Sequence, residues 1–207
     1  MIGRGSLFII AAPSGAGKTS LVKRLIEQME AILVSISYTT RPIRPAEVDG
    51  ENYFFISIEA FKTKIKQNHF LEYADVFGNY YGTSRAWVEE KLAAGIDVIL
   101  EIDWQGAQQV RKQSQPVCSI FILPPSLTAL QQRLQARAQD ESDVIAKRMA
   151  NAQQEMSHYS EFDYVIINDE FSHALNQLQT IIQAERLRTA KQQFKYYKLL
   201  AELVGNQ

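Results

Sequence analysis

The sequence predicts an α/β fold: a doubly wound parallel sheet of the P-loop kind, with a smaller mixed α/β insertion and a helical lid. Short apolar runs alternate with amphipathic stretches of helical period, which is typical of parallel sheets with right-handed crossovers. The first apolar run leads through a glycine-bearing turn into Lys18-Thr19, the pattern of a phosphate-binding loop between a strand and a helix. The alternation breaks between residues 38 and 85, where the insertion is expected.

The apolar runs are predicted to be buried strands, and the stretches between them helices. The strands are Leu7–Ala11, Ile32–Ser37, Asp97–Ile102, Val117–Leu123 and Tyr164–Asn168. The helices are Leu21–Met29, Ala86–Ala94, Leu127–Ala138 and Asp143–Met156. The stretch Ala174–Val204 is expected to form one or two amphipathic helices. Some of its apolar residues can pack on the sheet or on another subunit: Phe194, Tyr197, Leu200, Leu203 and Val204.

Composition limits the class of protein. The 207 residues, of which 46% are apolar, suit one globular unit with a real core rather than a disordered chain. The 22 Lys and Arg nearly balance 23 Asp and Glu, so no overall field recruits nucleic acid. The single Cys118 excludes an intrachain disulfide framework and is expected to be a core residue. Neither a membrane span nor a signal peptide is recognisable, so we expect a cytoplasmic protein without membrane partners.

The segment Ala12-Pro13-Ser14-Gly15-Ala16-Gly17-Lys18-Thr19 is the candidate triphosphate site. Successive backbone N–H groups and the positive end of the following helix can surround a β-phosphate. Lys18 would reach the β and γ oxygens, and the Thr19 hydroxyl would hold Mg²⁺. Ala12 stands where the strict pattern has Gly, which is tolerable if its backbone conformation suits Ala. The alternative is an ordinary connection rich in small residues, but the flanking strand and helix favour phosphate binding.

Two regions depart from the strand–helix rhythm. The aromatic and turn-rich region 38–85 suits short strands with hairpin-like turns, apart from a helix at Ile58–Gln67. The long polar helices of Arg133–Ser160 suit a mobile flap, a lid that carries arginines: Arg133, Arg137 and Arg148. Residues 1–37 and 86–207 would then form the P-loop core.

The insertion offers a site for a second phosphate. Arg41 and Arg44 lie three residues apart, each followed closely by proline, and two guanidinium forks can bind a phosphate dianion bidentately. Tyr53 and Tyr81 can add phenolic donors. The alternative for each residue alone is a solvated basic loop with core aromatics; together with a phosphate loop, the binding interpretation is favoured.

Three carboxylates complete the candidate site. Glu72 lies in the apolar run Phe70–Ala74, where burial is costly unless hydrogen-bond donors meet the carboxylate. Guanine offers N1–H and N2–H₂ side by side, whereas adenine presents an acceptor; an exposed Glu on an alternating strand remains the alternative. Glu101 and Asp103 end an apolar strand on the same side. They are candidates for the Mg²⁺ water shell, and N-capping of a following helix is the alternative for Asp103.

Taken together, these segments resemble guanylate kinase in its bacterial form. The resemblance runs from about Leu7 to Arg188, and it is carried by motifs in the family's order: Ser14–Thr19, Ser37–Arg44, Glu51–Phe55, Gly78–Thr83 and Asp103–Gly106. Two positions differ from common family members, with Ala46 in place of Gly and Glu101 where Asp can occur.

The resemblance implies a nucleoside monophosphate kinase that transfers the γ-phosphate of ATP to GMP, and dGMP is a further expected acceptor. Residues implied to bind ATP are those of the loop from Ala12 to Thr19, with Arg133, Arg137 and Asn168. Residues implied to bind GMP are Ser37, Arg41, Arg44, Tyr53, Glu72, Tyr81, Thr83, Glu101 and Asp103. The catalytic set is Lys18, Arg41, Arg137 and Arg148, and the metal is Mg²⁺ at Thr19 with Asp103 or Glu101 through water.

Three other interpretations are compared with this one. A guanylate-kinase-like scaffold keeps the fold without catalysis, but it tends to lose the loop lysine, which this chain has as Lys18. A kinase of another small phosphorylated acceptor is the alternative among enzymes, and Glu72 favours guanine. A regulatory GTPase is disfavoured because no Asn-Lys-x-Asp motif occurs. The oligomeric state is open, with the C-terminal helices as the candidate interface.

Overall fold

A parallel sheet of five strands forms the centre of the molecule, in the order β2-β7-β1-β8-β9. The computed structural model describes residues 3–76, 78–113, 116–137 and 142–205, without the side chains of residues 137 and 142–144. Two strands have the predicted bounds, β1 (Leu7–Ala11) and β8 (Val117–Leu123). Three end earlier than predicted: β2 (Ile32–Val34), β7 (Asp97–Leu100) and β9 (Tyr164–Ile167).

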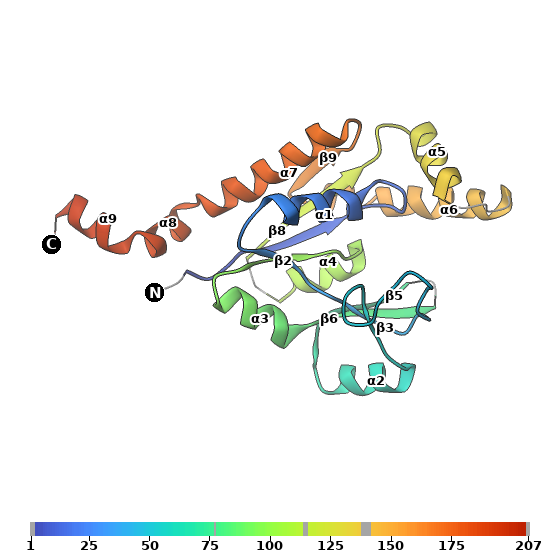
Figure 1. Ribbon diagram of the computed structural model, residues 1–207, viewed down its shortest axis with the longest axis horizontal. Helices are drawn as coiled ribbons and strands as arrows, with labels where there is room; N and C mark the ends of the chain where they lie inside the picture. Colours follow the sequence, from blue (N-terminus) through green and yellow to red (C-terminus); the bar gives the residue numbers. More distant parts are fainter. Residues whose placement is uncertain (1–2, 77, 114–115, 138–141, 206–207) are drawn as a thin grey trace.

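Helices cover both faces of this sheet, as a doubly wound fold requires (Figure 1). Phe8 and Ile10 of β1 pack with α1 (Lys18–Gln28) and α7 (Phe171–Arg186). Their neighbours Leu7 and Ile9 point to the opposite face, in the core cluster that includes residues of α3 (Arg85–Ala93) and α4 (Trp104–Arg111). The predicted α/β class is therefore confirmed, with α4 added as a helix outside the predicted set.

The predicted core position of Cys118 is also confirmed. Its thiol is buried on the α1 side of the sheet and forms no disulfide. Burial raises the pKa of this thiol to about 12, so it stays protonated at neutral pH and is unsuited to nucleophilic chemistry.

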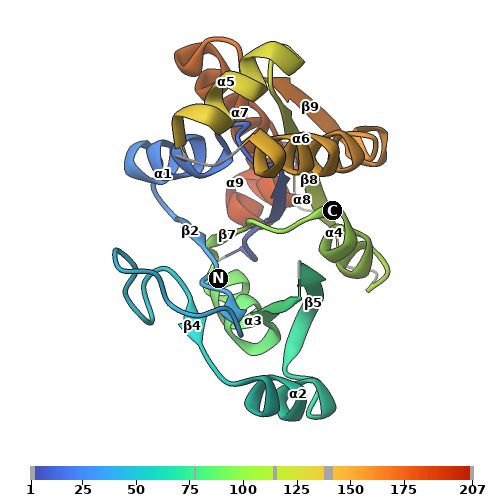
Figure 2. The same cartoon turned by 90° about the vertical axis from the view of Figure 1, so that its right-hand side faces the viewer.

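The region that breaks the rhythm forms a second sheet, in the order β4-β3-β6-β5. Its elements are β3 (Tyr38–Thr39), β4 (Phe54–Phe55), α2 (Ile58–Lys66), β5 (Phe70–Val76) and β6 (Asn79–Ser84). The predicted short strands and single helix are thus present. Strand β5 docks on α4: the backbone N–H of Tyr73 donates to Gln109 Oε1 at 3.1 Å, and Gln109 Nε2 donates to Tyr73 O at 2.6 Å. The second sheet is therefore fixed against the core beside α4 (Figure 2).

Two helices pack over the turn that follows β1. Helices α5 (Leu127–Arg137) and α6 (Ser142–Met156) share a small apolar cluster of Leu130, Leu134 and Ala152. A Cβ added to Gly15 would lie 3.0 Å from the side chains of Leu130 and Leu134, so α5 lies directly on the candidate phosphate loop. A short 3₁₀ turn, Tyr159–Glu161, connects α6 to β9.

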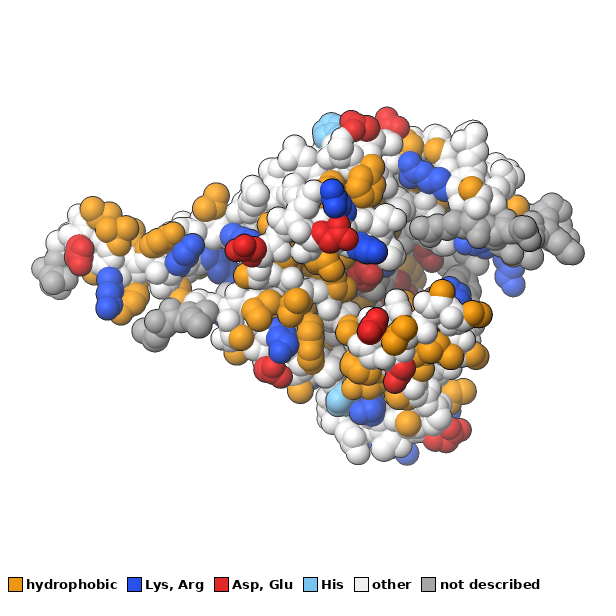
Figure 3. Space-filling view, viewed as in Figure 1, with side chains coloured by type: hydrophobic (Ala, Val, Ile, Leu, Met, Phe, Trp, Pro, Cys, Tyr) orange, Lys and Arg blue, Asp and Glu red, His pale blue; other side chains and the backbone are white. Residues whose placement is uncertain are grey.

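The C-terminal stretch differs from the prediction. It forms three helices, α7 followed by α8 (Thr189–Lys195) and α9 (Tyr197–Val204). Among the described residues, α8 and α9 bury no side chain, and Leu203 and Val204 are 71% and 77% exposed. Figures 1 and 3 show this segment projecting from the body, with apolar side chains on its surface. Of the two predicted alternatives, packing on the sheet is therefore contradicted, and packing on another subunit stays a prediction.

No helix within the described ranges has both the length and the apolar character needed to cross a membrane.

Candidate functional site

The connection from β1 to α1 has the backbone of an anion-binding loop. Gly15 and Gly17 have φ of 89° and 95°, values that a residue with a Cβ rarely adopts. The described non-glycine residues with positive φ are Ala31 and Asn68, so Ala12 takes an ordinary conformation and replaces Gly without strain. The N–H of Ala16 closes the turn on Pro13 O at 3.1 Å.

Asn168, which directly follows β9, supports this loop through a side-chain hydrogen bond. Its side chain is buried and donates from Nδ2 to Ala16 O at 2.7 Å. A Cβ on Gly17 would lie 2.4 Å from the same amide nitrogen. Glycine is therefore required at this position both for its positive φ and for the space that Asn168 occupies. Arg133 in turn donates to Asn168 O at 3.0 Å. Asn168 thus holds the loop in shape, and its contact with an adenine stays a prediction.

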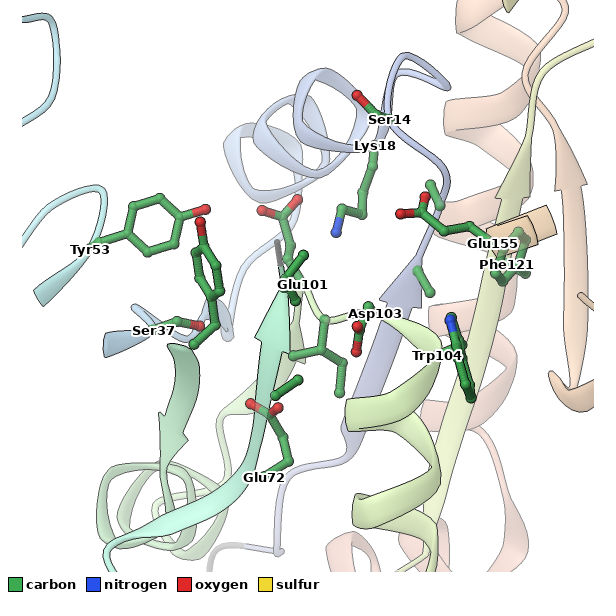
Figure 4. Close-up of a pocket in the computed structure, with 16 residues that line it drawn as sticks. Ser14, Lys18, Ser37, Tyr53, Glu72, Glu101, Asp103, Trp104, Phe121 and Glu155 are labelled. Carbon is green, nitrogen blue, oxygen red and sulfur yellow. The ribbon is translucent and has the colours of Figure 1, made fainter. Parts of the chain in front are cut away.

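One cavity of about 200 Å³ joins this loop to the second sheet (Figure 4). It gathers many of the predicted side chains from both parts of the chain: Ala12, Ser14, Lys18, Ser37, Tyr53, Glu72, Tyr81, Glu101 and Asp103. Other predicted residues lie outside this lining, in the loop, the insertion or the lid: Pro13, Gly15, Ala16, Gly17, Thr19, Arg41, Arg44, Thr83, Arg133, Arg148 and Asn168. The arrangement brings a lysine that suits phosphate and a buried carboxylate to one cavity.

Glu72 is the buried carboxylate, with 4% of its surface exposed. Burial is the main cause that raises its pKa to about 7, Asp103 adds to the rise, and Thr83 across the β5–β6 ladder opposes it. Thr83 Oγ1 is buried and makes no hydrogen bond of standard geometry within the described part. A carboxylate in this setting is kept for a purpose other than stability, because burying it costs free energy.

The backbone of α4 approaches Glu72 closely. A Cβ added to Gly106 would lie 2.7 Å from Glu72 Oε2, so only glycine leaves room for the carboxylate in its present position. The first turn of α4 and strand β5 therefore shape the pocket for this group together.

Glu101 and Asp103, which follow β7, line the part of the cavity that lies between the phosphate loop and the second sheet. Asp103 Oδ1 accepts the N–H of Gly106 at 2.8 Å and caps α4, so the capping alternative is confirmed; Asp103 also lines the cavity. Glu101 Oε1 is buried with no hydrogen-bond partner among the described residues. Within the described ranges no three His, Cys, Asp or Glu side chains are grouped as metal ligands.

Arg41 is held beside the cavity by an ion pair. Its Nη2 lies 2.7 Å from Glu47 Oε1, Nη1 donates to Pro42 O at 2.7 Å, and its guanidinium carbon lies 5.5 Å from the Tyr53 ring centre. The pKa of Arg41 is raised, chiefly by its hydrogen bond to Glu47, and the pKa of Glu47 is lowered by the same bond. Arg44 is exposed, and its backbone N–H donates to Glu47 Oε2 at 2.9 Å. The phosphate contacts of both arginines stay predictions.

Helix α6 reaches the phosphate loop. Arg148 Nη2 donates to Ser14 Oγ at 3.4 Å. The side chain of Arg137 lies outside the described part of the structure.

Comparison with known proteins places this site in a family. The family model for guanylate kinase matches residues 4–185. The chain belongs to the guanylate kinase family. It is 57% identical to a protein of Hahella chejuensis named guanylate kinase, over 99% of this chain and 98% of the relative. A Vibrio parahaemolyticus guanylate kinase is 55% identical over 99% of this chain and 100% of its own length.

The fold agrees with a solved member of the guanylate kinase family. The crystal structure of guanylate kinase from Anaplasma phagocytophilum superposes with a TM-score of 0.77 at 31% sequence identity. The match covers 92% of this chain and 90% of that one. The predicted resemblance and the P-loop kinase fold are thereby confirmed.

Sequence reasoning did not assign several residues that line this guanylate kinase family site, among them Trp104 and Glu155. Trp104 lines the cavity and stacks on His158, with ring centres 3.7 Å apart and nearly parallel planes. Glu155 lines the same cavity from α6. Its signal was available, since it follows Arg148 by seven residues and so shares one face of a helix with it.

Proposed function

We propose that this protein transfers the γ-phosphoryl group of ATP to GMP, giving ADP and GDP. The observation that carries the proposal is the cavity that joins Lys18 of the phosphate loop to the buried carboxylate of Glu72. Membership of the guanylate kinase family supports the same reaction.

The donor half consists of the phosphate loop and the lid. Backbone N–H groups from Ala12 to Thr19 and the Lys18 ammonium bind the ATP phosphates. Residues 133–160 act as the lid, in which Arg133 and Arg137 contact ATP and Arg148 joins Lys18 in neutralising the transferred group. Asn168 lies near the adenine while it supports the loop.

The acceptor half is the insertion of residues 38–85. Guanine N1–H and N2–H₂ donate to the two oxygens of ionised Glu72, and adenine would be repelled there. Ser37 and Thr83 add polar contacts to the base, and the position of Thr83 beside Glu72, whose pKa it lowers, supports this role. The GMP phosphate is bound by the arginine and tyrosine set: Arg41, Arg44, Tyr53 and Tyr81. Glu101 and Asp103 complete the wall between the two nucleotides.

No general base is needed, because the attacking group is already a phosphate oxyanion. The obstacle is the approach of two anionic phosphates in line, so catalysis rests on positioning and charge neutralisation by Lys18 and the arginines. Mg²⁺, held by the Thr19 hydroxyl and nucleotide oxygens with Asp103 or Glu101 through water, would neutralise further charge on the ATP phosphates. Glu101 Oε1, which has no hydrogen-bond partner in the part of the chain that the structure describes, fits such a water-mediated role. Closure of the lid excludes water and limits ATP hydrolysis.

The rest of the proposal concerns setting and assembly. Residues 1–37 and 86–207 form the P-loop core that carries the phosphate loop. The enzyme uses dGMP as a second acceptor. It acts in the cytoplasm, which supplies ATP and GMP. Nucleic acid and membranes are not partners. The exposed apolar residues of α8 and α9, among them Leu203 and Val204, support self-association through these helices.

A coupled assay of ADP formation tests the proposed reaction. With ATP and Mg²⁺ present, GMP and dGMP should each give rapid turnover, whereas AMP and a sugar phosphate should not. Lys18→Ala should lower kcat by about 10²–10⁴-fold, as expected for loss of a preorganised charge. A scaffold protein would form no ADP with any acceptor, and equal turnover of AMP would overturn the assignment of guanine.

A further inference from the structure

Glu155 is a half-buried carboxylate for which the proposed reaction has no use. It lies near the end of α6, at the position where this helix passes the phosphate loop. Figure 4 shows its carboxylate directed into the cavity, on the side that carries Ser14 and Lys18. An anion beside a phosphate-binding loop needs an explanation, because it repels the expected ligand.

The surroundings of Glu155 show what its carboxylate contacts. Burial raises its pKa and nearby Asp103 adds to the rise, whereas a hydrogen bond from the Ser14 N–H and the charge of Lys18 lower it. The carboxylate thus lies beside the Ser14 N–H, on the side of the cavity that carries Lys18, and within the field of that ammonium. These are groups that an ATP phosphate would take.

A second contact ties the same helix to the same loop residue. Arg148 donates to Ser14 Oγ at 3.4 Å. Seven residues separate Arg148 from Glu155, so both side chains leave one face of α6. Helix α6 therefore presents an anion and a cation to the phosphate loop, two turns apart.

We propose that Glu155 is an internal anion that holds α6 on the phosphate loop in the empty protein and that the ATP polyphosphate displaces. A carboxylate and a phosphate cannot share Ser14 N–H and Lys18 without strong repulsion. Displacement releases the end of α6 and leaves the cation of this face, Arg148, to meet the incoming phosphates. ATP binding and lid position are thereby coupled. The proposal rests on the proposed donor role of the loop and is independent of which acceptor is used.

The test is the affinity for an ATP analogue with a non-transferable γ-phosphate, measured by calorimetry with Mg²⁺ and without GMP. Glu155→Gln keeps the size and an acceptor for Ser14 N–H but removes the charge. Because a hydrogen bond to a charged acceptor is stronger than one to a neutral acceptor, removal of this competitor should tighten binding by about 5- to 10-fold. Glu155→Ala should also bind more tightly, and adenosine affinity should not change in either variant.

Glu27→Gln is the matched control, since Glu27 is exposed on α1 and its loss changes the net charge equally. Unchanged or weaker binding in both Glu155 variants would overturn the proposal, as would equal tightening in the control. A fall in melting temperature without tighter binding would assign Glu155 a structural role and also overturn it. These outcomes differ from failure of the proposed function, in which the unmodified protein would bind no ATP or form no GDP.

Discussion

Replacing Glu72 with glutamine removes the charge expected to recognise guanine while keeping the shape of the side chain. In the folded protein the pKa of Glu72 is about 7, against an ordinary value of 4.5. A carboxyl group whose pKa is raised on folding stabilises the protein below its unfolded pKa, and this contribution is lost as the pH rises through the folded pKa. The free energy of unfolding should therefore fall between pH 4.5 and about pH 7 because of Glu72.

The size of this loss follows from the two pKa values. At about 1.4 kcal/mol for each pH unit, the interval from 4.5 to about 7 corresponds to about 3 kcal/mol. Glu72→Gln abolishes this loss. The cost of burying an amide in place of a neutral carboxyl is the same at every pH, so it cancels from the pH dependence. The variant should thus gain about 3 kcal/mol relative to the unmodified protein as the pH rises through this interval.

Urea unfolding of both proteins at a series of pH values measures this difference directly. In the same preparation, kcat/KM for GMP should fall by about 10²–10³-fold, because a neutral amide cannot accept both guanine donors. The Kd for ATP should be nearly unchanged. A stability difference that does not vary with pH, or an unchanged kcat/KM for GMP, would refute the account of Glu72.

Three further substitutions test the surroundings of this site. Gly106→Ala should displace the Glu72 carboxylate, because the new Cβ would lie 2.7 Å from its Oε2. We expect KM for GMP to rise on the order of 10-fold in steady-state kinetics. An unchanged KM would contradict the close approach of Gly106 to Glu72. Asn168→Ala leaves the Ala16 carbonyl without its side-chain donor. It should lower the free energy of unfolding, measured in urea, by about 1–3 kcal/mol and weaken ATP binding. Wild-type values for both quantities would show that the loop keeps its conformation without Asn168. Arg41→Lys keeps the charge but loses the planar guanidinium group that can bind a phosphate through two hydrogen bonds. The KM for GMP should therefore rise about 10-fold or more, whereas the Kd for ATP, measured by calorimetry, should stay the same. Equal changes in KM and Kd would argue against a role of Arg41 in binding the acceptor.

Local pattern was sufficient for the parts of the fold that depend on local chemistry. The phosphate loop has its glycines where φ is positive, at Gly15 and Gly17, and those positions are readable from sequence because few other residues fit. The strands β1 and β8 are continuous apolar runs buried on both faces, and their predicted bounds were correct. Helix α4 was absent from the predicted set because it has only eight residues and contains Gly106, which lowers helix propensity. The sequence indicated it only through the capping alternative for Asp103.

Tertiary pairing decided what the sequence left open. Burial of Glu72 follows from the docking of β5 on α4 and from the close approach of Gly106, contacts between segments more than thirty residues apart. The role of Glu155 depends on how α6 lies across the phosphate loop. The C-terminal helices show the opposite case, since α9 has an apolar face but buries none of its described side chains.

The central claim is that donor and acceptor nucleotides occupy one continuous site, and a linked ligand tests it most directly. A bisubstrate compound that joins adenosine to guanosine through a polyphosphate should raise the melting temperature well above the value with ATP, GMP or both, because it gains the binding energy of both halves without the cost of the second association. Stabilisation no greater than that given by the better single nucleotide would contradict the claim.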